Sequence, residues 1–182
     1  MQPEKAPLLS GVAVGVDIVG LAMKVVDAKY ANMEVSARLG LRDKYFPVAE
    51  LGIGDSKREG AETGNTFSTT SPYMRFGLDY NFNKKQNGNR FFAGVRYGFT
   101  SFSYDIDNPE QYDMLYKKLI PLHLEDMDGH AQWLELVIGY ETKLWSFIRL
   151  GGNFRFRFKT VGDFDDRGEP WFIPGFGINE TS

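Results

Sequence analysis

The chain contains no cysteine, no long apolar run and little net charge. With no cysteine among its 182 residues, it can form neither a disulfide bond nor a thiolate metal site. No run of about 18 apolar residues is present, which excludes a transmembrane helix. A net charge of -3 at pH 7 gives no reason to expect nucleic acid as a partner. The length suits one domain rather than two.

What the chain does contain is a strict alternation of apolar and polar residues. Phe91, Ala93, Val95, Tyr97 and Phe99 occupy every second position of one segment, and glycines and an arginine lie between them. Period-two alternation is typical of a β-strand whose two faces meet different surroundings. The alternation recurs in seven segments, which are residues 11–18, 33–41, 45–54, 74–82, 91–100, 133–141 and 148–158.

The connections between these segments are alternately short and long. The short ones are residues 42–44, 83–89 and 143–146, and the long ones are 19–32, 55–72, 105–131 and the stretch after 159. Tight turns at one rim and long loops at the other are typical of outer-membrane barrels. The short-turn rim gathers aromatic residues that we expect to form an interfacial belt, namely Tyr45, Phe82, Phe91, Trp145 and Phe147. We therefore predict an all-β fold, an antiparallel up-and-down membrane β-barrel.

The composition of the two faces indicates which one is inside. The apolar rows contain no charged residue, as expected for a surface in lipid, where a charge at mid-bilayer costs about 2–4 kcal/mol. The polar rows carry arginines, carboxylates and glycines, and most lysines lie in turns and loops. Guanidinium groups suit an enclosed network with carboxylates, and glycines suit a narrow interior. A soluble barrel or sandwich with the apolar rows inside is the alternative.

We predict that the polar rows line the interior with a network of ion pairs and leave no channel. Arginines and carboxylates are matched in number there, as a confined interior requires, because an unpaired buried charge is costly. The predicted members are Asp17, Glu34, Arg38, Glu50, Arg75, Asp79, Arg96, Glu135, Glu141, Arg149, Arg155 and Arg157.

The number of strands raises the question of closure. Bacterial outer-membrane barrels have even strand counts, whereas seven strands are found here. Residues 170–177 contain two prolines and alternate poorly, so they are predicted to form a loop. We expect eight strands when the barrel is complete, with the closing strand just after Ser182, or else an irregular closure.

The amino terminus bears on export. Met1-Gln2-Pro3-Glu4-Lys5 lacks the basic segment followed by an apolar one that marks a signal peptide. An outer-membrane protein must be exported, so we interpret residues 1–10 as a tail that follows a removed signal peptide. Residues 11–182 are then a single barrel domain.

Several motifs resemble those of a known family. They are Gly11-Val12-Ala13-Val14-Gly15-Val16-Asp17, Tyr45-Phe46-Pro47-Val48-Ala49-Glu50-Leu51-Gly52, Ser71-Pro72-Tyr73-Met74-Arg75-Phe76-Gly77, Gly94-Val95-Arg96-Tyr97-Gly98-Phe99, Trp133-Leu134-Glu135 and Trp171-Phe172-Ile173-Pro174-Gly175-Phe176-Gly177. Over almost its whole length the chain resembles a Bacteroidota family of small outer-membrane β-barrel proteins of unknown function. The resemblance implies a further strand after the Pro-Gly-Phe-Gly segment, and it implies no catalytic or binding residues.

Two apolar segments outside the strands are candidates for contact with a partner. Leu21 and Met23 lie in the first long connection, which we interpret either as a short helix or as a continuation of the first hairpin with a bulge. Trp171, Phe172 and Ile173 form either an exposed loop that contacts a partner or a plug that folds over the barrel mouth.

No catalytic set, metal site or cofactor site is predicted from the sequence. The two histidines, His123 and His130, lie in an acidic connection that we interpret as a solvated loop in preference to a metal site. We therefore predict a non-enzymatic scaffold or accessory subunit of an envelope complex. It would lie in the outer membrane of a Gram-negative bacterium, in contact with lipid and with another envelope protein. The alternatives are a lipid-modifying barrel enzyme that uses His130 and Ser101, and a soluble periplasmic barrel that binds an apolar ligand.

Overall fold

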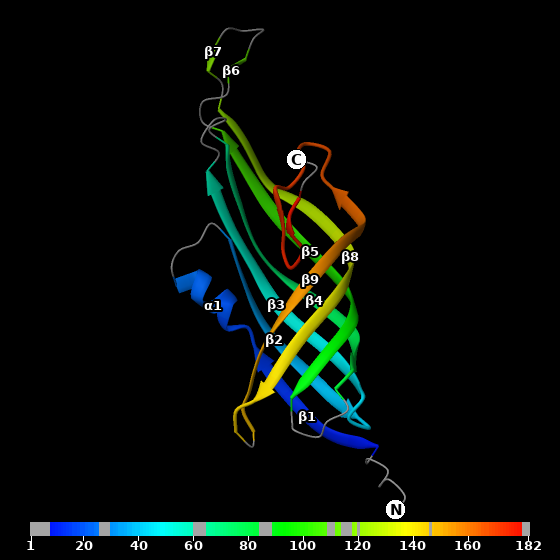
Figure 1. The fold of residues 1–182 in the computed structure, drawn as a ribbon. Coiled ribbons are helices and arrows are strands. Elements are labelled where there is room, and N and C mark those ends of the chain that lie inside the picture. The colour runs from blue at the N-terminus through cyan, green and yellow to red at the C-terminus, as the bar shows by residue number, and fades with distance from the viewer. Residues whose placement is uncertain are drawn as a thin grey trace, which may run out of the picture.

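One antiparallel sheet of seven strands dominates the protein (Figure 1). A computed structural model describes residues 8–25, 30–59, 65–83, 89–108, 112–113, 118–119, 121–145 and 147–179. The strands of the sheet, in spatial order, are β1 (Leu9–Val16), β2 (Tyr30–Leu41), β3 (Tyr45–Glu59), β4 (Thr66–Asn81), β5 (Arg90–Asn108), β8 (Leu122–Lys143) and β9 (Arg149–Phe164). The other elements are the helix α1 (Ile18–Val25) and two small ribbons, β6 (Tyr112–Asp113) with β7 (Lys118–Leu119) and β10 (Phe172–Ile173) with β11 (Gly177–Ile178).

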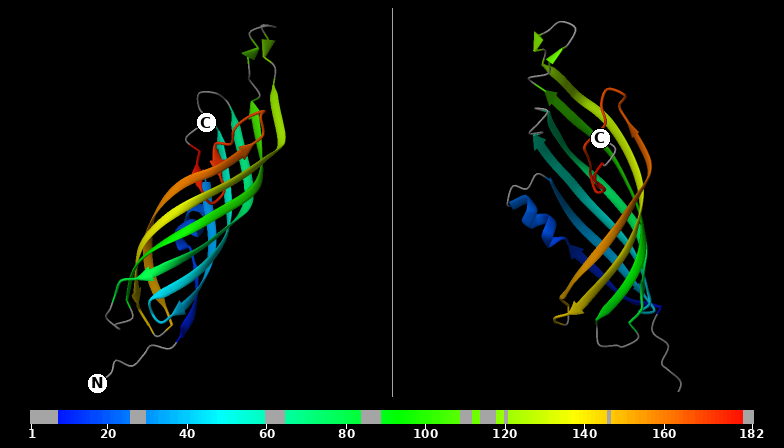
Figure 2. Two further views of the ribbon diagram at one scale, coloured as in Figure 1. Left: turned by 90° about the vertical axis from the view of Figure 1, so that its right-hand side faces the viewer. Right: turned by 45° about the horizontal axis from the view of Figure 1, so that its top comes forward.

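The sheet is curled but is not closed into a barrel. Every neighbouring pair is antiparallel, so the all-β, up-and-down part of the prediction is confirmed. Within the described residues, β1 and β9 are the two edges of the sheet, and no ladder joins them. Because six antiparallel steps separate these edges, β1 and β9 run in the same direction. They could pair directly only as parallel strands, which an up-and-down barrel does not contain. Figure 2 shows the resulting curved wall from two further sides.

The first strand ends earlier than the sequence predicted. β1 stops at Val16, and α1 begins at Ile18, so the interpretation of this connection as a short helix is confirmed. Asp17 caps the helix, since its Oδ1 accepts hydrogen bonds from the backbone N–H groups of Val19 at 2.9 Å and Gly20 at 3.2 Å. The side chains of Leu21 and Met23 are outside the described part of the structure. No helix in the described residues is long and apolar enough to cross a membrane.

The half of the sheet nearer the short turns, at the bottom of Figure 1, is called the lower section here, and the other half is the upper section. In the lower section, the apolar rows face outward and the polar rows face inward. On β5, Val95 is 53% exposed and Tyr97 is 42% exposed, whereas the intervening Arg96 is 2% exposed. Buried polar residues also alternate with exposed apolar ones on β3, where Glu50 precedes Leu51. The predicted inside and outside faces are therefore confirmed. The alternative in which the apolar rows form an interior core does not agree with this arrangement.

The alternation reverses in the upper part of the same strands. Beyond Thr100 on β5, the residue types of the two faces are exchanged. The inward residues Phe102 and Tyr104 are apolar and buried, while the outward residues Ser101 and Ser103 are polar and exposed. The pairing with β8 passes through this region in register, from Phe99 opposite Gln132 to Ser103 opposite Asp128. The strands therefore run from a section with an apolar exterior into a section with an apolar interior.

This reversal explains why the predicted strands are too short. A single phase of alternation ends near residue 100 in β5, yet the ladder continues to Asn108 opposite Leu122. Much of the predicted loop 105–131 is thus strand. The connections from β2 to β3, from β4 to β5 and from β8 to β9 fall where short turns were expected, and in the first of them Arg42 and Asp43 adopt positive φ angles of 52° and 54°.

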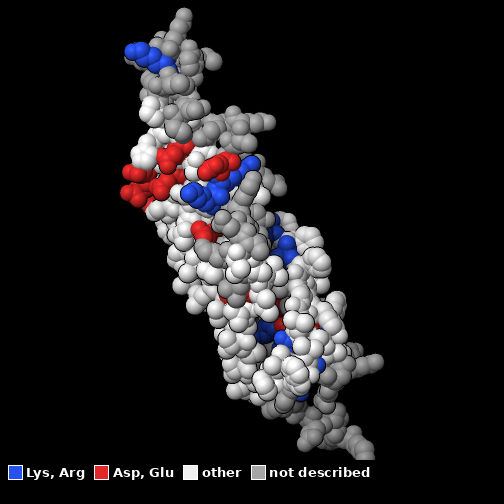
Figure 3. All heavy atoms as spheres, turned by 90° about the vertical axis from the view of Figure 1, so that its left-hand side faces the viewer, with Lys and Arg blue, Asp and Glu red and all other residues white. Residues whose placement is uncertain are grey.

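Figure 3 shows acidic and basic side chains gathered toward one end of the molecule, while most of the flank of the sheet is uncharged. At the opposite, short-turn end, aromatic residues form a chain of ring contacts. Tyr45 and Tyr80 have ring centroids 5.5 Å apart, Tyr80 and Phe82 are 4.9 Å apart, and Phe82 and Phe91 are 6.0 Å apart. Trp145 and Phe147 are also exposed.

Candidate functional site: a charged interior beneath an apolar plug

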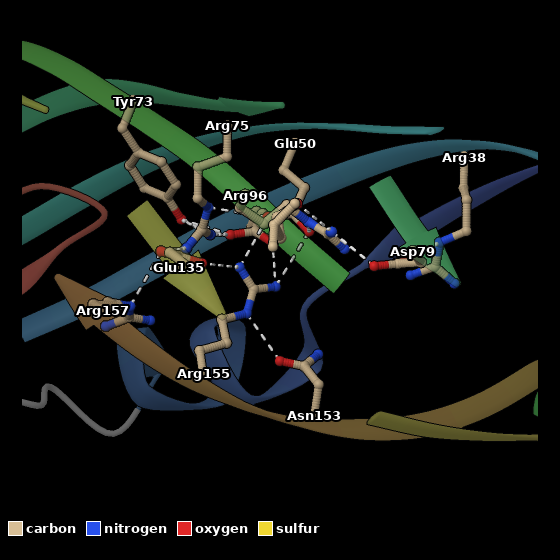
Figure 4. Close-up of polar contacts among 12 residues, drawn as sticks. Arg38, Glu50, Tyr73, Arg75, Asp79, Arg96, Glu135, Asn153, Arg155 and Arg157 are labelled. Carbon is tan, nitrogen blue, oxygen red and sulfur yellow. Dashed lines mark hydrogen bonds and ion pairs between the residues drawn. The ribbon is translucent and has the colours of Figure 1, made fainter. Parts of the chain in front are cut away.

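Arg75 is at the centre of the charged interior (Figure 4). It projects from β4 and contacts carboxylates of three other strands. Its Nε lies 3.0 Å from Oε2 of Glu50, its Nη1 lies 2.9 Å from Oε1 of Glu135, and its Nη2 contacts Glu34. Only 2% of Arg75 is exposed. One guanidinium group thus joins β2, β3, β4 and β8, which fits the five-donor geometry of arginine.

A second group of ion pairs extends toward the short-turn end. Arg96 contacts Asp79 at 2.7 Å and Glu50 at 3.3 Å. Arg38 lies 3.5 Å from Asp79 and also contacts Glu141. Shared carboxylates therefore connect this group to the contacts of Arg75 in one continuous network.

Arg155 and Arg157 bring the last strand, β9, into the same network. Arg155 Nη1 lies 2.8 Å from Oε2 of Glu50, and its Nη2 lies 3.1 Å from Oε1 of Glu34. Arg155 Nη1 is also 3.4 Å from Oε2 of Glu135, and Arg157 Nε is 3.3 Å from Oε1 of the same residue. Since Glu34 belongs to β2 and Glu50 to β3, these contacts cross the interior and hold the sheet in its curl.

Ten of the twelve residues predicted for this network take part in the ion pairs described above. Asp17 instead caps α1, and Arg149 is exposed at the beginning of β9. Arg90, which sequence reasoning missed, pairs with Glu141 at 3.7 Å. Arg90 precedes the predicted strand by one position and has the inward phase, so a one-residue extension would have found it. Two further buried members, Tyr73 and Trp133, hydrogen-bond to Glu34 at 3.0 Å and to Glu135 at 2.7 Å.

Among the residues that the structure describes, the ion pairs of this network named above join five carboxylates and six arginines. They are Glu34, Glu50, Asp79, Glu135 and Glu141 with Arg38, Arg75, Arg90, Arg96, Arg155 and Arg157. Each carboxylate contacts at least two arginines. The arrangement suits mutual neutralisation in a packed interior rather than proton exchange with a substrate.

Glycines make the space that these large side chains fill. A Cβ atom at Gly98 would lie 2.3 Å from the ring of Trp133, and one at Gly52 would lie 2.2 Å from the ring of Tyr73. Gly77 likewise lies under Arg96, where a Cβ would approach the Arg96 Cδ to 2.6 Å. The glycines of the polar rows are thus required by the bulk of the inward residues.

The segment 165–179, named the plug here, folds back into the upper part of the curled sheet. Phe172 and Ile173 are fully buried there, in a cluster with Phe67, Phe102, Tyr104, Met127 and Ala131. Of the two alternatives for Trp171, Phe172 and Ile173, the structure shows the plug. The prediction of a partner contact is wrong for Phe172 and Ile173, because neither is exposed. Trp171 is partly buried, with the guanidinium carbon of Arg58 4.2 Å from its ring centroid.

Contacts made by Arg157 and Trp133 join the plug to the charged interior below it. Arg157 Nη1 donates a hydrogen bond to the backbone oxygen of Phe176 at 2.7 Å. The ring of Phe176 lies 5.9 Å from that of Trp133, edge to face. Trp133 in turn donates to Glu135, so Arg157 and Trp133 each contact both the plug and the ion pairs.

The upper section places the candidate catalytic residues on its outer face. Ser101 is the cross-strand partner of His130, and His130 is the partner of Asp163 on β9. All three residues are exposed. The register therefore aligns a serine, a histidine and an aspartate in one row across β5, β8 and β9.

The second histidine lies further along the projecting part of β5 and β8. His123 contacts Asp107 through Nδ1, and its Nε2 lies 2.6 Å from Oε1 of Glu125. Hydrogen bonds to Asp107 and Glu125 raise the pKa of His123 above its ordinary value. In the described part of the chain, no group of three or more histidine, aspartate and glutamate side chains is arranged to hold a metal ion.

The fold and the interior define the class of protein as an all-β protein built on one curled antiparallel sheet with a charged lower interior. The family model of a domain of unknown function, DUF6048, matches residues 4–182, and the chain belongs to that family. Neither the curated proteins nor the solved structures contain a match.

Proposed function

We propose that this protein is an outer-membrane β-barrel of a Gram-negative bacterium that acts without catalysis, as a scaffold or accessory subunit of an envelope complex. The observation that carries the proposal is the reversal of alternation within single strands. Below the reversal the exterior is apolar and the interior is charged, which is the arrangement favoured in lipid. Above it the interior is apolar and the exterior is polar, which is the arrangement favoured in water.

The dimensions of the lower section support this proposal. On β5 the outward apolar row runs over nine residues, from Phe91 to Phe99, which is at the lower end of the about 9–11 residues that a tilted strand needs to cross a bilayer. The exposed aromatic residues at the short-turn rim suit a membrane–water interface. The acidic residues of the upper section would then lie in water on the far side.

Closure of the barrel is part of the proposal. The two edges, β1 and β9, run in the same direction, so one further strand that runs oppositely would be antiparallel to both. Eight strands would satisfy the even count of bacterial outer-membrane barrels. In membranes an unpaired sheet edge is costly, because lipid offers no hydrogen bonds to the backbone.

The partner surface is proposed to be α1. Its exposed residues include Ile18 at 66%, Val19 at 69% and Val25 at 86%. Scattered exposed apolar residues are ordinary in water, but a helix that is apolar on its exposed side suits contact with lipid or with an apolar surface of another envelope protein. Phe172 and Ile173 of the plug are buried, so the proposal assigns this role to α1.

Membrane fractionation of the exported protein tests the proposed location, followed by gel migration with and without boiling. Extraction that depends on detergent, together with migration that changes on heating, is expected. A soluble product that needs no detergent would refute a lipid-facing exterior.

Replacement of α1 residues tests the partner role. A Val19→Asp, Val25→Asp double variant is expected to reach the outer membrane and to lose proteins that co-purify with the unaltered protein. Lys118→Asp, an exposed change far from α1, is the control. Full function and unchanged co-purification in the double variant would refute the scaffold role of α1.

A second candidate function is lipid-ester hydrolysis, which the row of Ser101, His130 and Asp163 favours. Ser101 Oγ would attack the ester carbonyl and pass its proton to His130, and Asp163 would orient the imidazole. Proton return to the alcohol leaving group, followed by attack of water on the acyl-serine, would complete the reaction. Lipid profiles unchanged between the unaltered protein and the Ser101→Ala and His130→Ala variants would remove this candidate.

A further inference from the structure

The plug (residues 165–179) is built on a hairpin whose backbone closes on itself. Phe176 N donates a hydrogen bond to Ile173 O across the turn at 3.0 Å. Asn179 N donates to Trp171 O at 2.8 Å at the open end of the hairpin. Its strands β10 and β11 pair with each other in a sheet separate from the seven-stranded one. The plug can therefore leave the upper section as a unit, because its departure breaks no ladder of the seven-stranded sheet.

The space that the plug fills in the upper section has apolar walls. Phe172 and Ile173 are fully buried there. The buried wall residues come from β4, β5 and β8, and they are Phe67, Phe102, Tyr104, Met127 and Ala131. Together the two plug side chains contribute about eleven carbon atoms to this close-packed cluster, which is the size of a medium-length alkyl chain. A ligand that took their place would therefore need an apolar chain of similar volume.

Two cations of β9 hold the plug through uncharged acceptors. Arg157 Nη1 donates to the backbone oxygen of Phe176 at 2.7 Å. Lys159 Nζ donates to the side-chain oxygen of Asn179, also at 2.7 Å. Arg157 and Lys159 are two positions apart on the strand and therefore share a face. Because Arg157 Nε lies 3.3 Å from Oε1 of Glu135, its guanidinium group binds the charged interior on one side and the plug on the other.

A carboxylate would bind these two cations more strongly than a carbonyl and an amide do. It adds Coulomb attraction to both hydrogen bonds, and this attraction is stronger where side chains exclude water. Trp133, the cross-strand partner of Lys159, is fully buried beside this position. A ligand with one carboxylate and one apolar chain would thus satisfy the cations and the apolar walls at the same time.

We propose that the upper section is a binding site for a long-chain alkyl carboxylate, which the plug fills when no ligand is bound. The carboxylate accepts hydrogen bonds from Arg157 and Lys159 in place of the two oxygen atoms of the plug. The alkyl chain takes the place of the two buried apolar side chains of the plug. The plug is then a competitor, so the measured affinity is the intrinsic affinity reduced by the fraction of molecules whose site is open. This site does not depend on the proposed partner role of α1.

Tryptophan fluorescence can detect this ligand from inside the protein. Of the three tryptophans, Trp171 belongs to the plug, Trp133 contacts it, and Trp145 is exposed at the opposite end. A Trp145→Phe background therefore leaves both reporters beside the site. The probe is dodecanoate with a bromine atom at the end of its chain, since bromine quenches tryptophan fluorescence on contact. The neutral control is the corresponding bromododecanol. Both are added to the protein in phosphatidylcholine discs at mildly alkaline pH, where the carboxyl group is ionised.

Bromododecanoate is expected to quench saturably, with an apparent affinity about tenfold above that of bromododecanol. Arg157→Gln and Lys159→Gln should each reduce this preference, whereas Lys143→Gln, an exposed change at the opposite end, should leave it unchanged. Phe172→Ala weakens the packing of the plug and should raise the affinity for bromododecanoate by about tenfold, because the site is open in more molecules. Asn179→Ala removes the acceptor of Lys159 and should raise the affinity in the same direction.

Each contrary outcome overturns a defined part of the proposal. Equal affinity for the acid and the alcohol, or an unchanged preference in Arg157→Gln and Lys159→Gln, would refute recognition of the carboxylate. Unchanged or weaker binding in Asn179→Ala and Phe172→Ala would refute competition with the plug, and the first variant decides alone if the second does not assemble. Absence of saturable quenching would refute the site. Fractionation and co-purification are separate measurements, so failure here is distinguishable from failure of the proposed function.

Discussion

Phe99 and Phe102 are three residues apart on β5 and face opposite sides of the sheet. Phe99 is 38% exposed on the outside, whereas Phe102 is 3% exposed within the apolar cluster beneath the plug. An odd spacing places two residues of a continuous strand on opposite faces. The same residue type is thus outside in the lower section and inside in the upper section. This change marks a boundary between two surroundings near residue 100.

A charge introduced below this boundary should be much more damaging than one introduced above it. We expect Val95→Arg to reduce membrane assembly and to lower the free energy of unfolding in lipid by about 2–4 kcal/mol. Ser103→Arg, on the outward face of the same strand, should cost about 1 kcal/mol or less. Folding into vesicles, followed by urea titration, measures both values. Equal tolerance of the two arginines would contradict the assignment of the lower section to lipid.

Arg155 should be essential for the curl of the sheet, since it links the edge strand β9 to β2 and β3. In Arg155→Gln, carboxylates at the centre of the network lose a partner in a buried setting, and the free energy of unfolding should fall by about 3 kcal/mol. Arg149→Gln, an exposed change on the same strand, is the matched control and should have a small effect. Denaturant titration followed by tryptophan fluorescence is the measurement. Equal stability of the two variants would show that the cross-interior ion pairs do not hold β9.

Glycines of the sheet should be replaceable only where the space around them is open. Gly98→Val would drive a side chain into the ring of Trp133, and we expect a loss of about 1–3 kcal/mol in the free energy of unfolding. Gly152→Val is the control, because no atom lies within 4 Å of the position of its Cβ. Thermal unfolding of both variants tests this difference. Similar melting temperatures would contradict the packing of Trp133 over Gly98.

The plug should owe its position to Phe172. Phe172→Ala removes a fully buried ring and should cost about 3–5 kcal/mol of plug or domain stability, seen as faster proteolysis between 165 and 179. Ile178→Ala, in the same small ribbon but 47% exposed, should leave the cleavage rate nearly unchanged. If the Phe172→Ala protein resists protease as the unaltered protein does, the plug is held by other contacts.

The ion pairs of His123 predict a pH-dependent upper section. The raised pKa of His123 means that protonated His123 binds Asp107 and Glu125 more favourably in the folded state. Its stabilising effect is complete below the unfolded pKa of about 6.5 and is lost as pH rises through the higher folded pKa. NMR titration of the imidazole is the measurement. Asp107→Asn should lower the measured pKa toward 6.5, and an unchanged value would contradict this pairing.

The charged interior could be predicted from the sequence because period two fixes which residues share a face. The rows assigned to the outside contain no charged residue. Arg96 and Glu135 therefore belonged to the inward rows, and their burial could be predicted. The exact pairs could not be predicted in this way. Arg155 contacts Glu34 across the interior, and that distance depends on how tightly the sheet curls.

The plug and the helix were less predictable. Trp171 and Phe172 had two interpretations, because an apolar loop is equally consistent with an external partner and with an internal cavity. Only the packing against Met127 and its neighbours distinguishes them. The extension of β5 beyond Thr100 was missed for a related reason, since a reversal of phase resembles the end of a strand when one surrounding is assumed throughout.

The sequence by itself determined where the seven strands of the sheet lie, though not their full lengths, and it determined their order and the identity of the two faces, because backbone geometry couples position along a strand to side-chain direction. The tertiary structure decided what local patterns cannot specify. It determined that β1 and β9 stay apart, that Arg155 crosses the interior and that the plug fills the upper section. These features depend on the curvature of the whole sheet, which is set by the summed packing of large side chains against glycines from several strands.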